Sequence, residues 1–277
     1  EDMWKHGTTK KNLDILRGFD NHIIPAEHGE LASGLVGEGR MAEPETIVNW
    51  LNSFFLQQNE LSGKKILITA GPTYEKIDPV RFIGNHSSGK MGIAIAEEIK
   101  SRGGDVTLVL GPSGIKVNGG INVINVTSAA EMLRACEEQF ANADIAIMSA
   151  AVADYTPVQP ANEKIKKTEK ELRVELTKTT DILKTLGGLK TNKQVLVGFA
   201  LETNNEEEYA LQKLQTKNAD MIVLNSLQDA GAGFGHDTNK ITIFDKTGKA
   251  YPFGVKSKKE VARDIVNTII QQFYAKN

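Results

Sequence analysis

The chain has 277 residues, of which 40% are hydrophobic and 25% are charged, as in a soluble globular protein with one large or two medium domains. The formal net charge of −2 gives no reason to expect nucleic acid or an anionic membrane as a partner. A single cysteine, Cys136, excludes an intrachain disulfide, and we expect it to be a core residue of a cytoplasmic protein. No apolar run reaches the length of a membrane span.

Residues 1–60 are predicted to form a separate region with little core. They contain one helix around 45–57 and a glycine-rich stretch, "SGLVGEGRM". Their charged start lacks the apolar segment of a signal peptide, and without an initiator Met the chain reads as a piece of a longer protein. We expect the boundary at Leu61-Ser62-Gly63.

Residues 61–277 show apolar strands that alternate with amphipathic helices. The first strand is "KKILITA" (64–70), and the first helix follows in "KMGIAIAEEIKSRGG" (90–104). A late hairpin is expected around Thr247-Gly248, before a closing helix at 257–275. This order predicts an α/β fold: a doubly wound, mainly parallel, Rossmann-like sheet with helices on both faces.

Four segments come directly after predicted apolar strands. They are "TAGPT" (69–73), "SAAVADY" (149–155), "GFALETN" (198–204) and "LNS" (224–226). Ligands of open α/β sheets bind beyond the carboxyl ends of the strands, so we expect these four segments to meet at one site.

The stretch "GNHSSGKMG" (84–92) partly fits the P-loop pattern G-x-x-x-x-G-K. Met91 replaces the required Ser or Thr, and the 13 residues 71–83 separate the stretch from its strand, so we reject a P-loop. Two interpretations remain for the helix that starts near Lys90: serine capping, or an anion site at the helix N-terminus. The expected anion loop consists of Gly71, Thr73, Ser87, Ser88 and Gly89.

Lysines gather in "EKIKKTEKE" (163–171), with Lys164 first, and at Lys213 and Lys217 on one helical face. Both groups are either solvated surface or cations for a polyphosphate, and in the second case 163–171 would act as a lid. The five histidines have no metal-ligand spacing.

The motifs "ILITAGPTYEKIDPVRFIGNHSSGKMG", "SAAVADY", "EKIKK", "VGFALETNN" and "GFGHDTNKITIF" together resemble one family. Residues 61–277 look like the phosphopantothenoylcysteine synthetase domain of the bacterial bifunctional coenzyme A biosynthesis flavoprotein. The resemblance implies a CTP-dependent ligation of 4'-phosphopantothenate and L-cysteine through an acyl-cytidylate, in a homodimer, with magnesium.

The resemblance also implies roles for individual residues. Asn85 would stabilise the acyl-cytidylate, and Lys164 would neutralise phosphate charge. Asp154 would lie at the nucleotide site and act there through magnesium. Arg81 would reach substrate or the partner subunit. The implied nucleotide-binding residues are Met148, Ser149, Ala150, Asp154, Lys164, Thr180, Asp181, Ile182, Leu183, Phe199, Lys213 and Lys217. The family often has Asn-Pro where this chain has Thr179-Thr180, so the side chains at these two positions depart from the family's pattern.

Residues 1–60 resemble the end of the partner domain, phosphopantothenoylcysteine decarboxylase. The family's catalytic Cys is replaced by Ser33, and its catalytic Asn and flavin domain would precede Glu1. We therefore expect no decarboxylation by this chain, and flavin mononucleotide only in the longer protein.

Two other classes of protein stay open on the residues alone. An NAD(P)-dependent reductase would need a glycine fingerprint. "GEGRMA" (37–42) matches its pattern without a preceding strand, and the Tyr209–Lys213 pair lies on a helix away from the expected strand edge. A non-catalytic nucleotide-binding scaffold leaves a lysine loop beside a helix N-terminus unexplained.

Overall fold

The computed structural model of the chain describes residues 2–19, 21–31, 33–57, 59–166, 172–202, 205–226 and 237–274. The chain divides into two units, Glu1–Asn59 and Glu60–Asn277. Leu61 is almost fully buried in the core of the second unit. None of the helices among these residues is both long and apolar enough to cross a bilayer.

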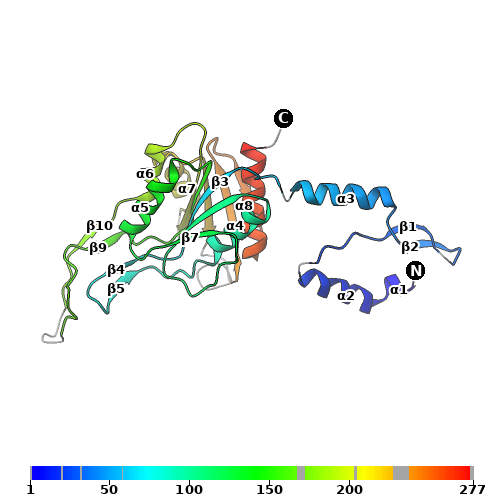
Figure 1. Cartoon of the computed structure of the whole chain (residues 1–277), viewed down its shortest axis with the longest axis horizontal. Coiled ribbons are helices and arrows are strands. Elements are labelled where there is room, and N and C mark those ends of the chain that lie inside the picture. The colour runs from blue at the N-terminus through cyan, green and yellow to red at the C-terminus, as the bar shows by residue number, and fades with distance from the viewer. Residues whose placement is uncertain are drawn as a thin grey trace. The chain divides into compact units, whose positions relative to one another are not determined.

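An eight-stranded sheet forms the centre of the second unit (Figure 1). Its strands from β12 to β7 run parallel, whereas β14 and β15 pair antiparallel as the expected late hairpin. The strands in sheet order are β15 (Ala250–Pro252), β14 (Ile241–Asp245), β12 (Met221–Ser226), β11 (Val195–Glu202), β8 (Ile145–Met148), β3 (Lys65–Ala70), β6 (Asp105–Leu110) and β7 (Asn122–Asn125).

Helices cover both faces of this sheet because successive strand residues point to opposite sides. Ile66 and Ile68 of β3 pack with the side of α4 and α8, whereas Leu67 packs with the side of α5, α6 and α7. The helices are α4 (Lys90–Ser101), α8 (Lys258–Phe273), α5 (Ala129–Phe140), α6 (Ile182–Leu189) and α7 (Glu206–Thr216). The predicted doubly wound α/β fold is confirmed, and Cys136 is a buried core residue of α5, as expected.

Two of the four segments that were expected to follow strands are part of those strands instead. Strand β11 continues through Glu202 because its parallel pairing with β12 extends to Glu202 and Ser226. The segments 198–204 and 224–226 therefore lie largely inside strands, not after them. Phe199 consequently approaches the site from within a strand.

Two-stranded ribbons project beside the carboxyl ends of the central strands (Figure 1). One pairs β4 (Tyr74–Lys76) with β5 (Phe82–Gly84), and another pairs β9 (Tyr155–Pro157) with β10 (Leu176–Lys178). A third pairs β13 (Thr238–Asn239) with β16 (Lys256–Ser257). The short runs of these ribbons lack the alternating pattern on which the strand predictions relied.

The first unit has few buried apolar side chains. Its elements are α1 (Asp2–Lys5), α2 (Gly7–Gly18), β1 (Glu27–Glu30), β2 (Val36–Arg40) and α3 (Pro44–Gln57). The predicted helix at 45–57 corresponds to α3, whose Val48, Leu51 and Phe55 are exposed. The glycines of the "GEGRMA" stretch, Gly37 and Gly39, lie within strand β2 and not in a turn after a strand, so the stretch does not form a dinucleotide fingerprint.

Candidate active site

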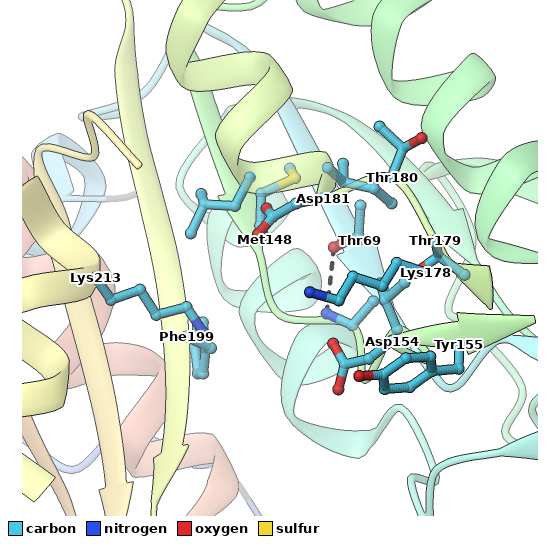
Figure 2. A pocket seen from close by; sticks show the side chains of 14 residues that line it. Thr69, Met148, Asp154, Tyr155, Lys178, Thr179, Thr180, Asp181, Phe199 and Lys213 are labelled. Atoms are coloured by element: carbon cyan, nitrogen blue, oxygen red, sulfur yellow. Dashed lines mark hydrogen bonds between the residues drawn. The ribbon is translucent and has the colours of Figure 1, made fainter. Parts of the chain in front are cut away.

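A cavity of about 490 Å³ lies at the carboxyl ends of β3, β8 and β11 (Figure 2). Figure 2 shows Lys213 and Phe199 on one side of it, and Asp154, Tyr155 and Thr179 on the other. Its size and mixture of apolar and charged side chains suit a small organic ligand that carries negative charge. The residues that line it are Thr69, Met148, Ala150, Val152, Asp154, Tyr155, Lys178, Thr179, Thr180, Asp181, Ile182, Leu183, Phe199 and Lys213.

Most residues assigned to nucleotide binding by resemblance lie together in this cavity. Nine of them are among its lining residues: Met148, Ala150, Asp154, Thr180, Asp181, Ile182, Leu183, Phe199 and Lys213. Ser149, Lys164 and Lys217 are not. The nine lining residues come from β8, β11, α6, α7 and the intervening loops, so segments far apart in the sequence converge on the cavity.

Asp181 connects the cavity to the two helices beside it. As the N-cap of α6, its carboxylate accepts a hydrogen bond from the Lys184 N–H at 2.8 Å, and Lys217 Nζ lies 2.7 Å away. Burial opposes ionisation of Asp181, but these bonds and the nearby charge of Lys213 outweigh it and lower its pKa. Lys217 therefore acts on the cavity indirectly, because its charge is used to hold the start of α6.

The expected anion loop adjoins the cavity and is tied to the segment after β8. The Gly71 carbonyl accepts from Ala151 N–H at 2.9 Å, and Thr73 Oγ1 accepts from Ala153 N–H at 2.9 Å. Ser149 Oγ donates to the Thr69 carbonyl at 2.6 Å. The segments 69–73 and 149–153 are thus one hydrogen-bonded unit.

The start of α4 has no serine cap. Its N-cap is Gly89, with φ of +80°, and no side chain caps the helix. Ser87 Oγ accepts only from the Gly89 N–H, at 3.4 Å, and the Ser88 carbonyl accepts from Ser113 Oγ. A side chain at Gly89 would come within 3.2 Å of the Gly71 backbone nitrogen. The serine-capping interpretation is therefore wrong, and an anion site at this terminus stays a prediction.

The two residues to which resemblance assigns the chemistry do not line the cavity. Asn85 is exposed, and its Nδ2 donates to the Val152 carbonyl at 2.9 Å. Lys164 is also exposed. Arg81 pairs with Asp78 of its own chain, and its contact with substrate or a partner subunit stays a prediction. Residues Lys167–Glu171 of the lysine segment lie outside the described residues.

Thr69, Val152 and Tyr155 line the cavity and lie in the strand-end segments that were expected to meet there, whereas Lys178 and Thr179 line it without having been predicted as site residues. Lys178 is the most consequential of them because it adds a second cation to the cavity beside Lys213. It lies in β10 three residues before Asp181, so its place in "TKTTDIL" was the available signal. Tyr209, four residues before Lys213, does not line the cavity, so the pair gives no support to a reductase site.

The cavity fits magnesium only together with a phosphate ligand. The described residues contain no group of three or more His, Cys, Asp or Glu that could hold a metal ion. Asp154 and Asp181 are both exposed carboxylates of the cavity, but Asp181 is already paired with Lys217. Mg²⁺ takes six oxygen ligands and often binds through one or two carboxylates plus substrate phosphates. Asp154 fits that role.

This α/β fold, with a cavity at the carboxyl ends of its parallel strands, is that of a Rossmann-like domain. Residues 61–273 match the family described as the DNA/pantothenate metabolism flavoprotein C-terminal domain, DFP, and the chain belongs to this family.

Several relatives align over almost the whole chain. A protein named cysteine/cysteine sulfinic acid decarboxylase, from an unknown prokaryotic organism, is 53% identical over 97% of this chain and 76% of its own length. The coenzyme A biosynthesis bifunctional protein CoaBC of Haemophilus influenzae is 44% identical over 99% of this chain and 68% of its own length. The crystal structure of a CoaBC C-terminal domain is 47% identical over 78% of this chain and all of that chain, with a TM-score of 0.67.

Proposed function

We propose that this chain is a phosphopantothenate–cysteine ligase of coenzyme A biosynthesis that uses CTP. The observation that carries the proposal is the convergence of nine residues, assigned to the nucleotide by resemblance, on one cavity at the strand ends. The identity to CoaBC of Haemophilus influenzae supports the same activity.

The reaction proceeds in two steps. A carboxylate oxygen of phosphopantothenate attacks the α-phosphorus of CTP, and the bond to the β-phosphate oxygen breaks, releasing pyrophosphate. The cysteine amine then attacks the acyl carbon, CMP leaves with the electron pair of the acyl–oxygen bond, and the amine loses a proton. Both steps place developing negative charge on oxygen, so fixed donors and cations are the groups that accelerate them.

The cavity residues supply binding and charge compensation. Lys178 and Lys213 place two cations near a triphosphate, and Phe199 and Met148 offer apolar contacts to a base. Asp154 would hold Mg²⁺ together with phosphate oxygens, and the metal would neutralise phosphate charge. Asn85 serves the acyl-cytidylate from the rim, and Lys164 neutralises phosphate from its loop. The active unit is a homodimer, in which Arg81 contacts substrate or the partner.

The test of the ligase proposal is pyrophosphate release with phosphopantothenate and each of the four nucleoside triphosphates in turn. We expect release with CTP, dependent on phosphopantothenate, followed by amide formation when cysteine is added. Release with another nucleotide alone would overturn the choice of base. No release with any of the four would overturn the ligase assignment.

The first unit is proposed to be the end of a decarboxylase domain. Because the alignment with CoaBC of Haemophilus influenzae covers 99% of the chain, it includes nearly all of this unit. Ser33 stands where the decarboxylase family has its catalytic cysteine, and a serine hydroxyl is a poorer nucleophile and acid than a thiol. We therefore expect no carbon dioxide release from phosphopantothenoylcysteine, cysteine or cysteine sulfinate with added flavin mononucleotide. Release from any of the three would contradict this assignment.

A further inference from the structure

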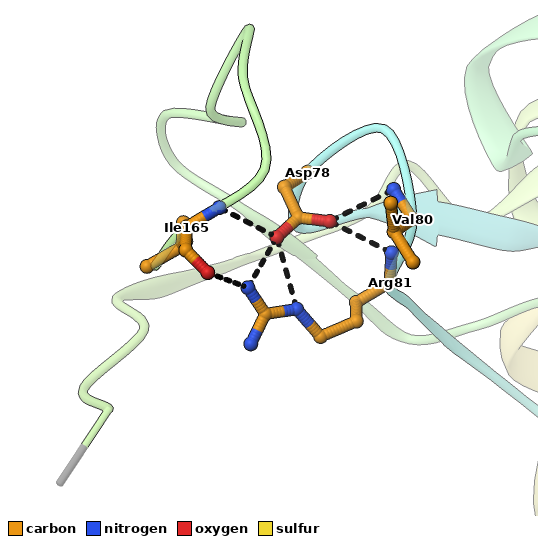
Figure 3. Close-up of polar contacts among 4 residues, drawn as sticks. All are labelled: Asp78, Val80, Arg81 and Ile165. Carbon is orange, nitrogen blue, oxygen red and sulfur yellow. Dashed lines mark hydrogen bonds and ion pairs between the residues drawn. The ribbon is translucent and has the colours of Figure 1, made fainter. Parts of the chain in front are cut away.

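Ile165, which lies directly between Lys164 and Lys166, is held at both of its backbone polar groups (Figure 3). Its N–H donates to Asp78 Oδ2 at 3.2 Å, and its carbonyl accepts from Arg81 Nη2 at 2.8 Å. The two partners come from the turn between β4 and β5, more than 80 residues earlier in the sequence. Two bonds to one residue fix both the position and the direction of the backbone there.

Asp78 is the centre of this arrangement. Its carboxylate is buried, and one oxygen accepts the N–H groups of Val80 and Arg81, both at 2.8 Å. The other oxygen accepts Arg81 Nε at 2.9 Å in addition to Ile165. The Arg81 guanidinium and these N–H groups lower the pKa of Asp78 far below its ordinary range. The carboxylate is therefore charged at neutral pH.

A third hydrogen bond ties the segment before Ile165 to the same turn. Ala161 N–H donates to the Ile77 carbonyl at 2.9 Å, and the turn is closed by Ile77 N–H donating to the Arg81 carbonyl at 2.9 Å. The segment 161–165 is thus attached to the turn 77–81 at both of its ends. We call these contacts of Asp78 and Arg81 with Ile165 the Ile165 latch.

We propose that Asp78 is a positioning residue for Lys164 in the activation of phosphopantothenate by the nucleotide. Asp78 acts through the Ile165 latch. This inference rests on the proposed ligase function. A lysine has a flexible four-carbon stem, so an exposed Lys164 can be aimed at a phosphate only if its backbone is fixed. Asp78 accepts the N–H of Ile165 directly. It also accepts a hydrogen bond from the Arg81 side chain and so orients it towards the Ile165 carbonyl.

The competing explanation is that Asp78 only closes its own turn. The chain offers a matched control in Asp245, another nearly buried carboxylate. It accepts bonds from Thr247 N–H, Lys249 N–H and the Tyr251 hydroxyl in the hairpin of β14 and β15. Asp245→Asn should lower stability without any effect on the lysine segment.

The first arm of the test is hydrogen exchange at the Ile165 amide, measured without any nucleotide. We expect Asp78→Asn to accelerate this exchange roughly tenfold, whereas Asp245→Asn leaves it unchanged, because only Asp78 accepts that N–H. Unchanged exchange at Ile165 in a folded Asp78→Asn variant would overturn the latch. If Asp78→Asn does not fold, Arg81→Lys, which keeps the positive charge but not the forked donor, takes its place in both arms.

The second arm is a double-mutant cycle on acyl-cytidylate formation in a single turnover. Asp78→Asn should slow this step roughly tenfold in the wild-type background and less than twofold in the Lys164→Gln background, because the lysine that it positions is already gone. Amide formation from preformed acyl-cytidylate should stay within twofold. An equal slowing in both backgrounds would show that Asp78 acts independently of Lys164 and would overturn the proposal.

Failure of the proposed function would look different. It would appear as a wild-type chain that releases no pyrophosphate with any nucleoside triphosphate, before any variant is made. Failure of the latch alone would appear as an active wild type with an additive cycle or unchanged exchange.

Discussion

The two parts of the candidate site are built in different ways. The cavity is formed by strand ends and by the helix caps that pack against them, so its shape is fixed by the core of the sheet. Asn85 and Lys164 instead lie on exposed loops that a few hydrogen bonds hold in place. Asn85 donates to the Val152 carbonyl, and Ile165 beside Lys164 is bonded to Asp78 and Arg81. The cavity is thus preorganised by the fold, whereas the chemistry proposed for Asn85 and Lys164 depends on loop geometry.

This contrast predicts two kinds of substitution. Changes at the loop residues should alter rates and leave the free energy of unfolding almost unchanged, because exposed side chains contribute little to stability. Changes beneath the cavity should alter stability first. The predictions below test each half of this comparison.

The largest effect is expected for Asn85→Asp. Loss of an amide donor at a developing oxyanion costs roughly a hundredfold or more, so amide formation should slow by that factor while pyrophosphate release stays largely intact. A carboxylate would also face the Val152 carbonyl and the phosphate, and both contacts are repulsive. A quenched single-turnover assay that counts acyl-cytidylate and amide separately measures this.

Asn85→Ala is the matched control for charge. It removes the donor without adding a carboxylate, so it should be less damaging than Asn85→Asp if repulsion contributes. Accumulation of acyl-cytidylate is expected in both variants. If neither variant forms the intermediate, Asn85 acts in the first step and its assignment is wrong.

Lys164→Gln should slow the first step by roughly tenfold to a hundredfold, since a cation is lost where the triphosphate develops charge. The second step, started from isolated acyl-cytidylate, should be unaffected. The thermal midpoint should stay within about 1 °C of the wild type because the side chain is exposed. Intermediate that accumulates in Lys164→Gln would show that the roles of Lys164 and Asn85 are reversed.

The fold could be predicted from sequence because continuous apolar strands and amphipathic helices encode burial directly. The same reasoning located the strand-end segments, since parallel strands bring their carboxyl ends to one edge. It expected the segment 198–204 to follow its strand, although residues 198–202 belong to β11. Pairing with β12, a tertiary effect, extends that strand through Glu202.

The latch and Lys178 could not be predicted in the same way. Asp78 and Ile165 are 87 residues apart, and no pattern in either segment indicates a backbone bond between them. Lys178 lies on β10, a three-residue strand that depends on its pairing with β9. Residues such as these are set by packing of loops, for which sequence periodicity carries no signal.

Stability beneath the cavity can be tested at two adjacent glycines of α6. A side chain at Gly187 would lie 1.9 Å from the Lys217 carbonyl oxygen, whereas one at Gly188 would meet nothing within 4 Å. Gly187→Ala should therefore destabilise the chain by about 1–3 kcal/mol through overpacking. Gly188→Ala should be neutral or stabilise it by up to about 1 kcal/mol, because alanine is the better helix former.

Denaturant unfolding of the two variants gives the measurement. A side chain at position 187 would displace the backbone of Lys217, whose side chain pairs with the cavity residue Asp181. Gly187→Ala should therefore also weaken nucleotide binding. Equal stability of the two variants would mean that α6 can move away from Lys217 freely, and the cavity would then be less rigid than the comparison requires.

The smallest effect concerns the charge pair of Asp181 and Lys217. The pKa of Asp181 is lowered in the folded chain, so its contribution to stability is present above its unfolded value and is lost as pH falls through the folded value. Lys217→Met removes the pairing while burial remains, so the folded pKa should rise. Since both side chains are partly exposed, the stability difference from wild type should be about 1 kcal/mol or less at neutral pH. The difference should shrink towards zero as Asp181 becomes protonated in both proteins.

Urea unfolding between neutral and acid pH measures this difference. The control variant is Lys193→Met, at an exposed lysine after α6. A difference between wild type and Lys217→Met that stays constant with pH would show that Lys217 stabilises the cavity through packing of its stem and not through the charge of Asp181.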